Sequence, residues 1–267
     1  MQCSMLMEVT LLSREDQMID YILVTGASSG VGKELAIQLS KEYNIVLSGR
    51  DDQRLAETKR SCKNDAIIWK YDLSDFVGVE KSLGKLIDEH NISITGFVHS
   101  AGVMKMLPLR GINCDTLMQV YSVNVFSAAL ITKLLSSKRI NGNSLKSIVF
   151  VSSNISNRGA AAFSVYGSSK SALDGLMRSL SVELAPRVRV NSVLPGGMET
   201  EMTKEIYSDE GKKAMFEKNT PLGIGKPSDI ASVVEFLLSD RSSWITGQQI
   251  TVDGGRTIDI TERGGNG

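Results

Sequence analysis

The stretch "YILVTGASSGVGKELAIQL", residues 21–39, runs from an apolar segment through a glycine-rich turn into an amphipathic segment. Ile22 to Thr25 form a short run rich in apolar and β-branched residues, which predicts a strand. Val31, Leu35 and Leu39 follow at four-residue spacing, which predicts a helix. A strand joined to a helix by a short turn is the first half of a βαβ unit, so the stretch predicts an α/β fold.

The turn between these elements carries three glycines, Gly26, Gly30 and Gly32. Gly26 permits a tight turn, Gly30 lets the backbone approach a phosphate, and Gly32 allows the helix to pack closely on the sheet. The spacing G-x-x-x-G-x-G differs from the G-x-G-x-x-G dinucleotide pattern, and a merely flexible turn is the alternative interpretation. The strand before it and the helix after it favour a phosphate-binding loop.

The rest of the chain repeats this alternation of strand and helix. Strands are expected at 22–25, 45–48, 66–71, 96–99, 147–152, 189–193 and 249–252. Helical periodicity marks 31–39, 79–87, 115–138, 164–184 and 228–238. The pattern predicts a Rossmann-type doubly wound parallel sheet of about seven strands in three α/β/α layers, with ligands bound beyond the carboxyl ends of the strands. We expect an N-terminal extension (1–20), one domain (21–258) with a substrate lid at about 198–221, and a tail (259–267).

Composition narrows the class of protein. The chain has 267 residues, 42% of them hydrophobic, and thirty basic residues balance thirty acidic ones without a long run of either sign. This balance favours a small-molecule enzyme over a protein that binds nucleic acid or a membrane. The chain has three scattered cysteines and two histidines, which do not form a disulfide framework or a zinc-ligand spacing, so we expect a reducing compartment and no metal. No continuous apolar run or signal peptide is evident, so a cytoplasmic location is expected.

The end of the second strand, "VLSGRDD" at 46–52, bears on the choice of cofactor. A carboxylate at this place binds the ribose 2′-hydroxyl of NAD(H), but Ser48 and Gly49 stand here instead. Arg50 could pair with a 2′-phosphate, which favours NADP(H) over NAD(H). The alternative is a solvated arginine whose charge Asp51 and Asp52 partly cancel.

A tyrosine and a lysine share one helix face in "FSVYGSSKSAL", 163–173, because Tyr166 and Lys170 are four residues apart. A lone Y-x-x-x-K pair is more often an ordinary helix surface than a catalytic pair. An ordinary phenol has a pKa near about 10, and a nearby ammonium lowers it toward the range where the phenol can act as a base.

Further motifs stand in a fixed order around this pair. They are "IVFVSS" (148–153), Asp72, "HSAG" (99–102), "SVNVFSA" (122–128), "NSVLPGGMETEM" (191–202) and "ITGQQITVDGG" (245–255). With the TGxxxGxG loop, and with Tyr166 thirteen residues after Ser153, the chain from 21 to 257 resembles the short-chain dehydrogenase/reductase family. It is similar to the single-domain, 3-oxoacyl-thioester reductase-like members.

The resemblance implies four catalytic residues, Asn124, Ser153, Tyr166 and Lys170. Tyr166 would be the general acid/base, Lys170 would lower its pKa, Ser153 would donate to the substrate oxygen, and Asn124 would position a water. Taken singly, Tyr166 could be a packed aromatic residue, Ser153 could cap a helix or turn, and Asn124 could bond to the backbone of its own helix. In this chain His99 and Ser100 replace the two asparagines of many members, and we expect His99 to be a strand residue rather than a second base.

The loop and the resemblance together imply a set of cofactor contacts. They are Gly26, Ser28, Ser29, Gly30, Val31, Gly32, Arg50, Asp72, Leu73, Ala101, Gly102, Tyr166, Lys170, Pro195, Gly196, Met198 and Thr200. The polar segment 199–221 is expected to cover the substrate. The apolar wall of the substrate site would consist of Met104, Met106, Leu107 and Phe163. Lys105, Arg110 and Arg158 would be either solvated or contacts for an anionic or carrier-linked group.

The sequence therefore predicts an oxidoreductase that transfers a hydride between NADP(H) and a ketone or secondary alcohol. One alternative is specifically a 3-oxoacyl-thioester (acyl-carrier-protein) reductase. Another is a non-catalytic dinucleotide-binding sensor, and the complete set of four catalytic residues weighs against it. The extended epimerase/dehydratase branch of the family is typically longer and has a different loop spacing. The family resemblance also implies a homo-oligomer, a tetramer or else a dimer.

Overall fold

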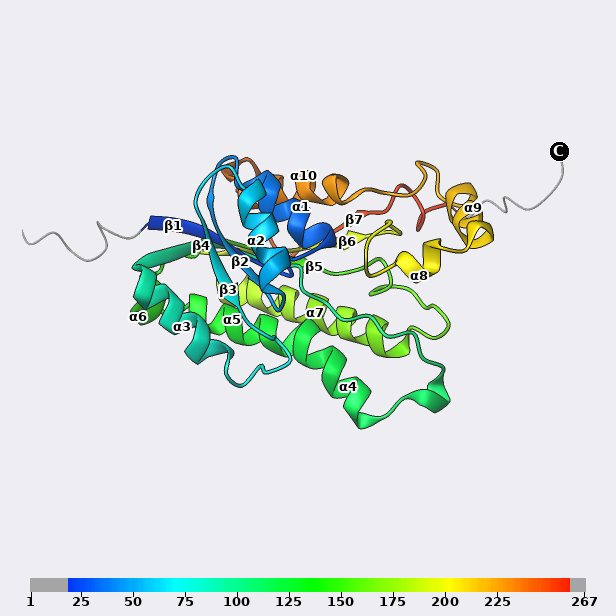
Figure 1. Ribbon diagram of the computed structural model, residues 1–267, viewed down its shortest axis with the longest axis horizontal. Coiled ribbons are helices and arrows are strands. Elements are labelled where there is room, and N and C mark those ends of the chain that lie inside the picture. The colour runs from blue at the N-terminus through cyan, green and yellow to red at the C-terminus, as the bar shows by residue number, and fades with distance from the viewer. Residues whose placement is uncertain (1–18, 260–267) are drawn as a thin grey trace, which may run out of the picture.

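The computed structural model describes residues 19–259, within which seven parallel strands form one sheet (Figure 1). The strands are β1 (Ile19–Thr25), β2 (Asn44–Gly49), β3 (Ala66–Lys70), β4 (Ile92–His99), β5 (Ser147–Val151), β6 (Arg189–Pro195) and β7 (Gln249–Val252). Their order across the sheet is β3-β2-β1-β4-β5-β6-β7. The predicted doubly wound Rossmann-type fold is confirmed. The predicted extension up to residue 18, and the tail from residue 260, lie outside the described residues.

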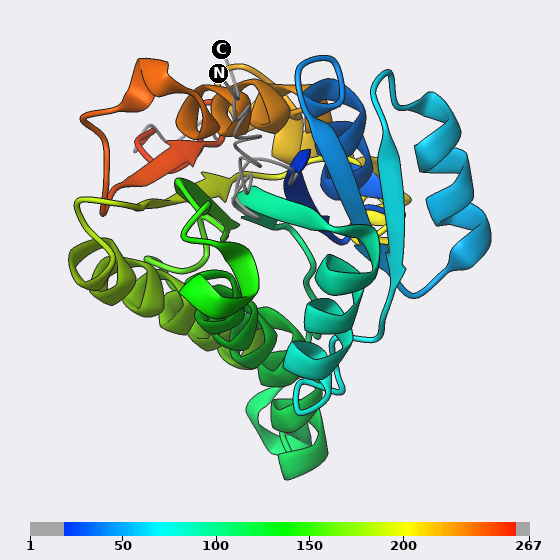
Figure 2. The ribbon, with the colours of Figure 1, turned by 90° about the vertical axis from the view of Figure 1, so that its left-hand side faces the viewer.

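Helices cover both faces of the sheet (Figures 1 and 2). The helices are α1 (Gly30–Leu39), α2 (Asp52–Ser61), α3 (Val79–His90), α4 (Cys114–Tyr121), α5 (Ser127–Leu135), α6 (Lys138–Asn141), α7 (Ser164–Glu183), α8 (Lys204–Tyr207), α9 (Glu210–Lys218) and α10 (Pro227–Leu238). Helices α1, α2 and α10 lie on one face, and α3, α5 and α7 lie on the other. Helices α8 and α9 lie beyond the carboxyl ends of the strands.

Two apolar clusters fill the spaces between the three layers. Successive side chains of a strand point to opposite faces of the sheet, so Leu23 of β1 joins one cluster while Ile22 and Val24 join the other. The first cluster packs on Ile131 of α5 and the second on Leu35 of α1. Both faces of the central strands are buried, which explains why these strands are recognisable in the sequence as short apolar runs.

The order in which successive strands are added to the sheet reverses beside β1. From β1 the chain passes to β2 and β3 on one side, and then crosses to β4 and onward on the other. Such a switch point opens a crevice beyond the carboxyl ends of the strands, where ligands of this fold bind. The glycine loop after β1 and the loop after β4 both end at this crevice.

The predicted helix at 115–138 runs without a break to Leu135 but contains an irregular turn. Helix α4 ends at Tyr121, a π-helical turn spans Ser122–Phe126, and α5 ends at Leu135. Taken together, Cys114–Leu135 is long and apolar enough to pass a composition test for a membrane span, but half of its most apolar window is buried inside the protein. The segment thus packs as a core helix, and its π-turn positions one of the predicted catalytic residues.

Helix α2 was not predicted from the sequence. Its sequence, "DQRLAETKRS", is strongly polar, and only Leu55 and Thr58 are buried. Asp51 caps its N-terminus by accepting a 3.1 Å hydrogen bond from the Arg54 amide. A helix that buries so little has no clear apolar stripe to reveal it.

Candidate active site

The glycine loop between β1 and α1 packs closely against the loop after β4. Gly26 has φ +72°, and a Cβ there would lie 2.8 Å from the amide nitrogen of Ala101, so only glycine fits against the loop after β4. A Cβ on Gly32 would lie 2.2 Å from the Gly26 carbonyl oxygen. Ser29 precedes α1 without capping it through its side chain, and the first turn carries no acidic residue. The helix N-terminus therefore remains suited to an anion such as the pyrophosphate of a dinucleotide.

At the carboxyl ends of β2 and β3, Arg50 and Asp72 face each other. Their charged groups are 3.9 Å apart, and the Arg50 side chain is 72% exposed. Asp51 is used as the cap of α2, and Asp52 pairs with Lys70. The two aspartates that follow Arg50 in the sequence thus have partners of their own, and Asp72 is the acid that pairs with Arg50.

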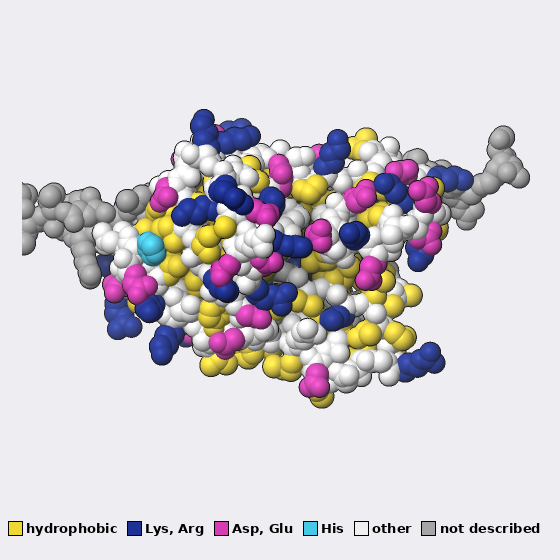
Figure 3. Space-filling model, in the orientation of Figure 1, with side chains coloured by type: hydrophobic (Ala, Val, Ile, Leu, Met, Phe, Trp, Pro, Cys, Tyr) yellow, Lys and Arg dark blue, Asp and Glu magenta, His cyan; other side chains and the backbone are white. Residues whose placement is uncertain are grey.

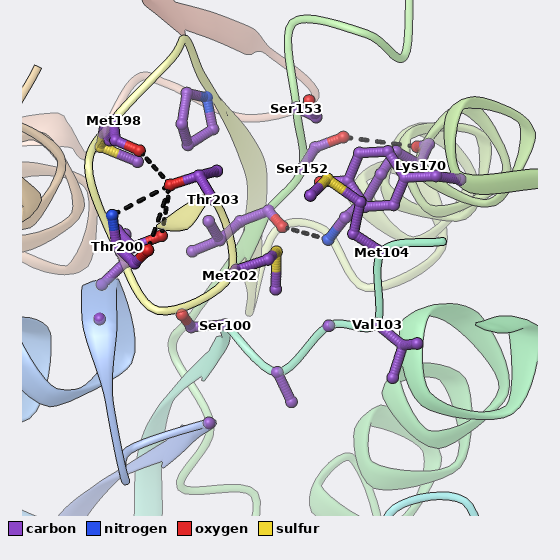
Figure 4. A pocket seen from close by; sticks show the side chains of 18 of the residues that line it. Ser100, Val103, Met104, Ser152, Ser153, Lys170, Met198, Thr200, Met202 and Thr203 are labelled. Carbon is purple, nitrogen blue, oxygen red and sulfur yellow. Dashed lines mark hydrogen bonds between the residues drawn. The ribbon is translucent and has the colours of Figure 1, made fainter. Parts of the chain in front are cut away.

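Ser153, Tyr166 and Lys170 come together between the end of β5 and the first turns of α7. The side chains of Ser153 and Tyr166 are almost fully buried. The pKa of Tyr166 is not lowered as expected from Lys170: burial raises it to about 12, and a hydrogen bond with the Ser153 hydroxyl partly offsets this rise. Lys170 Nζ lies 5.9 Å from the centre of the Tyr166 ring and donates a 2.8 Å hydrogen bond to the Val151 carbonyl oxygen (Figure 4).

The pKa of Lys170 is lowered toward neutral pH. Burial lowers the pKa of Lys170 to about 8, and the charge of Asp174, one helical turn further along α7, acts in the opposite direction. Asp174 is itself buried and accepts a 2.7 Å hydrogen bond from Gln249 of β7. A lysine with this pKa can carry a positive charge beside Tyr166 and also exchange a proton near neutral pH.

The Asn124 side chain forms hydrogen bonds within the protein, and its role in positioning a water stays a prediction. Its amide clamps the backbone of Val103: Oδ1 accepts from the Val103 N–H at 2.7 Å, and Nδ2 donates to the Val103 carbonyl at 3.1 Å. Nδ2 also donates to Ser169 Oγ at 2.9 Å. Asn124 is fully buried and does not line the cavity described below. These hydrogen bonds engage both ends of its side chain, and they run to another segment rather than to its own helix.

His99 is a buried strand residue, in keeping with the expectation for it. Its Nδ1 lies 3.0 Å from Thr25 Oγ1, and its Nε2 lies 3.1 Å from the Val123 carbonyl oxygen. Burial, reinforced by the charge of Lys170, lowers the pKa of His99 to about 3. The ring is therefore neutral, with Nε2–H donating to Val123. Thr25 Oγ1 also accepts from the Ala101 amide at 3.2 Å, so Thr25 and His99 join the ends of β1 and β4 to the π-turn.

One cavity of about 490 Å³ runs along the carboxyl ends of the strands. All the predicted cofactor contacts line it, as do Ser153, Tyr166 and Lys170, whereas Asn124 does not. Of the expected substrate wall, the cavity is lined by Met104, Phe163 and Arg158. Met106, Leu107, Lys105 and Arg110 are not among its lining residues. Glu201, Met202, Tyr207 and Phe216 line the cavity from the segment 199–221 that was expected to cover the substrate. Tyr71 and Arg256 also line it, and the sequence did not suggest them.

The start of segment 199–221, which the sequence predicted to be a lid, is folded over the glycine loop. Thr203 Oγ1 accepts from the Thr200 amide at 3.0 Å and donates to the Met198 carbonyl (Figure 4). A Cβ on Gly30 would lie 3.6 Å from Thr200 Cβ, so this turn lies directly above the predicted phosphate loop. Met202 extends from the same turn toward the space between Gly102 and Lys170. Within residues 19–259 no group of three His, Cys, Asp or Glu side chains could hold a metal ion.

The switch-point cavity, its glycine loop and its Ser–Tyr–Lys wall define a dinucleotide-binding α/β protein. Residues 26–257 match the profile of a family described as enoyl-(acyl carrier protein) reductase. The chain is 33% identical to L-xylulose reductase of Caenorhabditis elegans, over 88% of this chain and 94% of that protein. It is 30% identical to 3-oxoacyl-[acyl-carrier-protein] reductase FabG of Chlamydia pneumoniae, over 94% of this chain and all of that protein.

A solved structure of 4-hydroxyisoleucine dehydrogenase complexed with NADH is similar in fold. It has a TM-score of 0.83 and 27% sequence identity, and the match covers 90% of this chain and 99% of that one. The chain belongs to the short-chain dehydrogenase/reductase family, which confirms the resemblance found in its motifs. Its relatives are NAD(P)-dependent oxidoreductases that act on alcohols and ketones.

Proposed function

We propose that this protein transfers a hydride between NADP(H) and a ketone or secondary alcohol, with Tyr166 as the general acid/base. The observation that carries the proposal is the convergence of Ser153, Tyr166 and Lys170 on the cavity that the glycine loop also lines. The loop suits a dinucleotide because it leads into the N-terminus of α1, where Ser29 makes no side-chain cap and the first turn holds no acidic residue.

A bound nicotinamide dinucleotide would supply or accept the hydride. Tyr166 Oη would give its proton to the substrate oxygen during reduction and take it back during oxidation. The Ser153 hydroxyl would donate a hydrogen bond to the same oxygen, where negative charge grows in the transition state. The Lys170 ammonium would stabilise the tyrosinate that remains after the proton has left.

The raised pKa of Tyr166 bears on the direction of the reaction. At neutral pH a phenol with a pKa of about 12 holds its proton, which is the state that reduction of a carbonyl requires. Oxidation of an alcohol requires tyrosinate, which becomes more abundant as the pH rises. Oxidation should therefore gain more than reduction as the pH rises.

The preference for NADP(H) rests on Arg50. Its guanidinium is exposed and lies at the end of the cavity beside β2 and β3, where Gly49 leaves room next to Ser28. The 4-hydroxyisoleucine dehydrogenase complex with NADH concerns that protein and leaves the preference of this chain as a proposal. Arg50→Ser should lower kcat/KM for NADPH by about tenfold or more and change that for NADH little. Arg54→Ser, in exposed α2, is the matched control, and equal or better use of NADH by the unmodified protein would overturn the preference.

A narrower function, reduction of 3-oxoacyl thioesters, is the second candidate. The near-complete alignment with FabG favours it. The cavity wall offers Arg158 as a cation for a carrier-linked group, but Lys105 and Arg110 do not line the cavity. Activity with 3-oxoacyl thioesters above that with sugars and simple ketones would establish this narrower function.

The experiment that tests the proposal is a panel of sugars, aliphatic ketones, oxo acids and 3-oxoacyl thioesters, with oxidation of NADPH followed by absorbance. We expect turnover with at least one carbonyl class and its loss in Ser153→Ala. A protein that binds the cofactor but turns over no member of the panel would instead be the non-catalytic sensor.

We also propose a cytoplasmic homotetramer, or else a dimer. Trp244 (98% exposed) and Val182 (78% exposed) are large apolar side chains near the β7 edge and the end of α7. On the face shown in Figure 3, basic and acidic side chains are interspersed. Light scattering at the mass of a monomer would contradict either assembly.

A further inference from the structure

The strand order shows where each residue lies along the length of the cavity. Arg50 and Asp72, which follow β2 and β3, lie at one end, and Ser153 follows β5 near the middle of the sheet. Neighbouring strands are about 4.8 Å apart, so a residue that follows β7 lies about 10 Å beyond β5, away from Arg50. Arg256 follows β7 and lines the cavity. It therefore lies on the substrate side of the proposed catalytic group.

The guanidinium of Arg256 is held in a fixed position. Its Cζ lies 5.4 Å from the centre of the Phe216 ring of α9, and its Nη1 donates a 2.7 Å hydrogen bond to the Asn219 carbonyl oxygen. Within residues 19–259 no Asp or Glu forms an ion pair with Arg256, and its other N–H groups have no hydrogen-bond acceptor. A stacked guanidinium that is charged at all pH values and has donors to spare can bind an anion.

A second polar residue packs against the same Phe216 ring. Tyr207 of α8 is 6% exposed and lines the same cavity. Its ring packs edge-on against that of Phe216, with 5.4 Å between the ring centres. No hydrogen bond joins its hydroxyl to another residue in the described part of the chain. Burial raises the pKa of Tyr207, Glu199 raises it further, and Arg256 opposes both, so Tyr207 keeps its proton as a donor within electrostatic reach of the arginine.

The turn that carries Arg256 is tied to the catalytic wall through Asp253. Asp253 Oδ1 accepts from the Gly255 amide at 3.1 Å, and Oδ2 accepts from the Thr257 amide at 2.8 Å. Oδ2 also accepts from Asn154 Nδ2 at 3.5 Å, and Asn154 is the residue next to Ser153. The position of Arg256 relative to Ser153 is thus set by a short chain of hydrogen bonds.

We propose that Arg256 and Tyr207 bind a carboxylate of the substrate, so that the preferred substrates are small oxo or hydroxy carboxylic acids. This inference rests on the proposed function and narrows its substrate class. The guanidinium offers two parallel N–H donors that match the two oxygens of a carboxylate, and the Tyr207 hydroxyl offers a third donor. One unpaired positive charge matches the single negative charge of a carboxylate better than the double charge of a phosphate.

The direct test is calorimetric binding to the protein saturated with oxidised cofactor. Propionate, butyrate and their primary amides are the probes, with inorganic phosphate as a separate titrant. We expect the carboxylates to bind at least about tenfold more tightly than the amides. Arg256→Met and Tyr207→Phe should reduce this preference, and Arg256→Lys should restore part of it. Equal binding of acids and amides, no detectable binding of the acids, or tighter binding of phosphate would each overturn the proposal.

Two further variants show which arginine acts. Arg241→Met is the matched control, because Arg241 also lies over an aromatic ring, that of Phe236 at 5.8 Å, but does not line the cavity. Arg158→Met removes the other arginine of the cavity wall on the catalytic side. The preference for carboxylates should survive both substitutions. Its loss in Arg158→Met together with its survival in Arg256→Met would overturn the assignment to Arg256.

Failure of this inference can be told apart from failure of the proposed function. Oxo acids and their methyl esters are compared as substrates in parallel with the binding assay. Turnover of esters and acids at equal kcat/KM, without a carboxylate preference in binding, would overturn the inference and leave the oxidoreductase function in place. Arginine-dependent binding of carboxylates without any turnover would support the anion site and overturn the proposed chemistry.

Discussion

The side chain of Asn124 pairs with the backbone of Val103 through both its oxygen and its nitrogen, at 2.7 and 3.1 Å. These two hydrogen bonds resemble the pairing between neighbouring strands of a sheet, and they fix the loop after β4 against the π-turn. A Cβ on the adjacent Gly102 would lie 3.5 Å from Lys170 Nζ and 3.6 Å from Asn124 Oδ1. The clamp therefore holds in place Gly102 and Val103, which line the cavity together with Lys170.

Replacing Asn124 with alanine should destabilise the fold. The substitution leaves the N–H and the carbonyl of Val103 without this partner in a partly buried place, and each unsatisfied group costs about 1–3 kcal/mol. We expect the free energy of unfolding in urea to fall by about 3 kcal/mol. Asn113→Ala removes an exposed cap of α4 and should cost only about 1 kcal/mol. An equal loss in the two variants would show that the clamp is not structural.

The buried Lys170 should make stability depend on pH in a defined window. Its pKa falls from 10.5 in the unfolded chain to about 8 in the fold, so between these values the unfolded chain binds more protons. The free energy of unfolding attributable to Lys170 therefore rises with pH from about 8 to 10.5, by at most about 3 kcal/mol.

Lys170→Met cannot titrate at this position. Its stability advantage over the unmodified protein should be largest below pH 8 and should shrink as the pH rises toward 10.5. The raised pKa of Tyr166 acts in the opposite direction, but only above about pH 10, so measurements from pH 7 to 10 report Lys170. A stability difference that is constant over this range would contradict the burial of a titrating ammonium.

His99 should contribute to loss of stability in acid. Its pKa is lowered from 6.5 to about 3 in the fold, so the unfolded chain binds the extra proton first as the pH falls below 6.5. Stability should therefore fall with pH between 6.5 and about 3 more steeply in the unmodified protein than in His99→Asn, which has no titrating ring. Parallel curves from chemical unfolding at each pH would show that His99 is not buried in its neutral form.

The sequence predicted the sheet well because its physical signal is local. Both faces of the central strands are buried, so residues such as Val46 and Val149 stand in short apolar runs. The π-turn at Ser122–Phe126 was not predicted, because Val120, Val123 and Ala128 keep an apolar spacing that is also compatible with one regular helix. Helix α2 was missed because it buries little more than Leu55.

The candidate site was predictable where a motif places residues at fixed spacing, as for Tyr166 and Lys170. The partner of Asn124 could not be read from the sequence, because Val103 is 21 residues away and the contact depends on the π-turn. Arg256 and Tyr207 were missed for the same reason. They are far apart in the chain, they come from a turn after β7 and from the predicted lid segment, and only the fold brings both to the Phe216 ring.

The central claim is that Tyr166 moves the proton, and Tyr166→Phe tests it most directly. This variant keeps the packing of the ring against Phe163 and removes only the hydroxyl. Tyr121→Phe, whose tyrosine does not line the cavity, is the control. With a substrate identified by the panel, we expect Tyr166→Phe still to bind NADPH but to lose about 100-fold or more in kcat, while Tyr121→Phe keeps both properties. Near-normal turnover in Tyr166→Phe, with cofactor binding intact, would contradict the account.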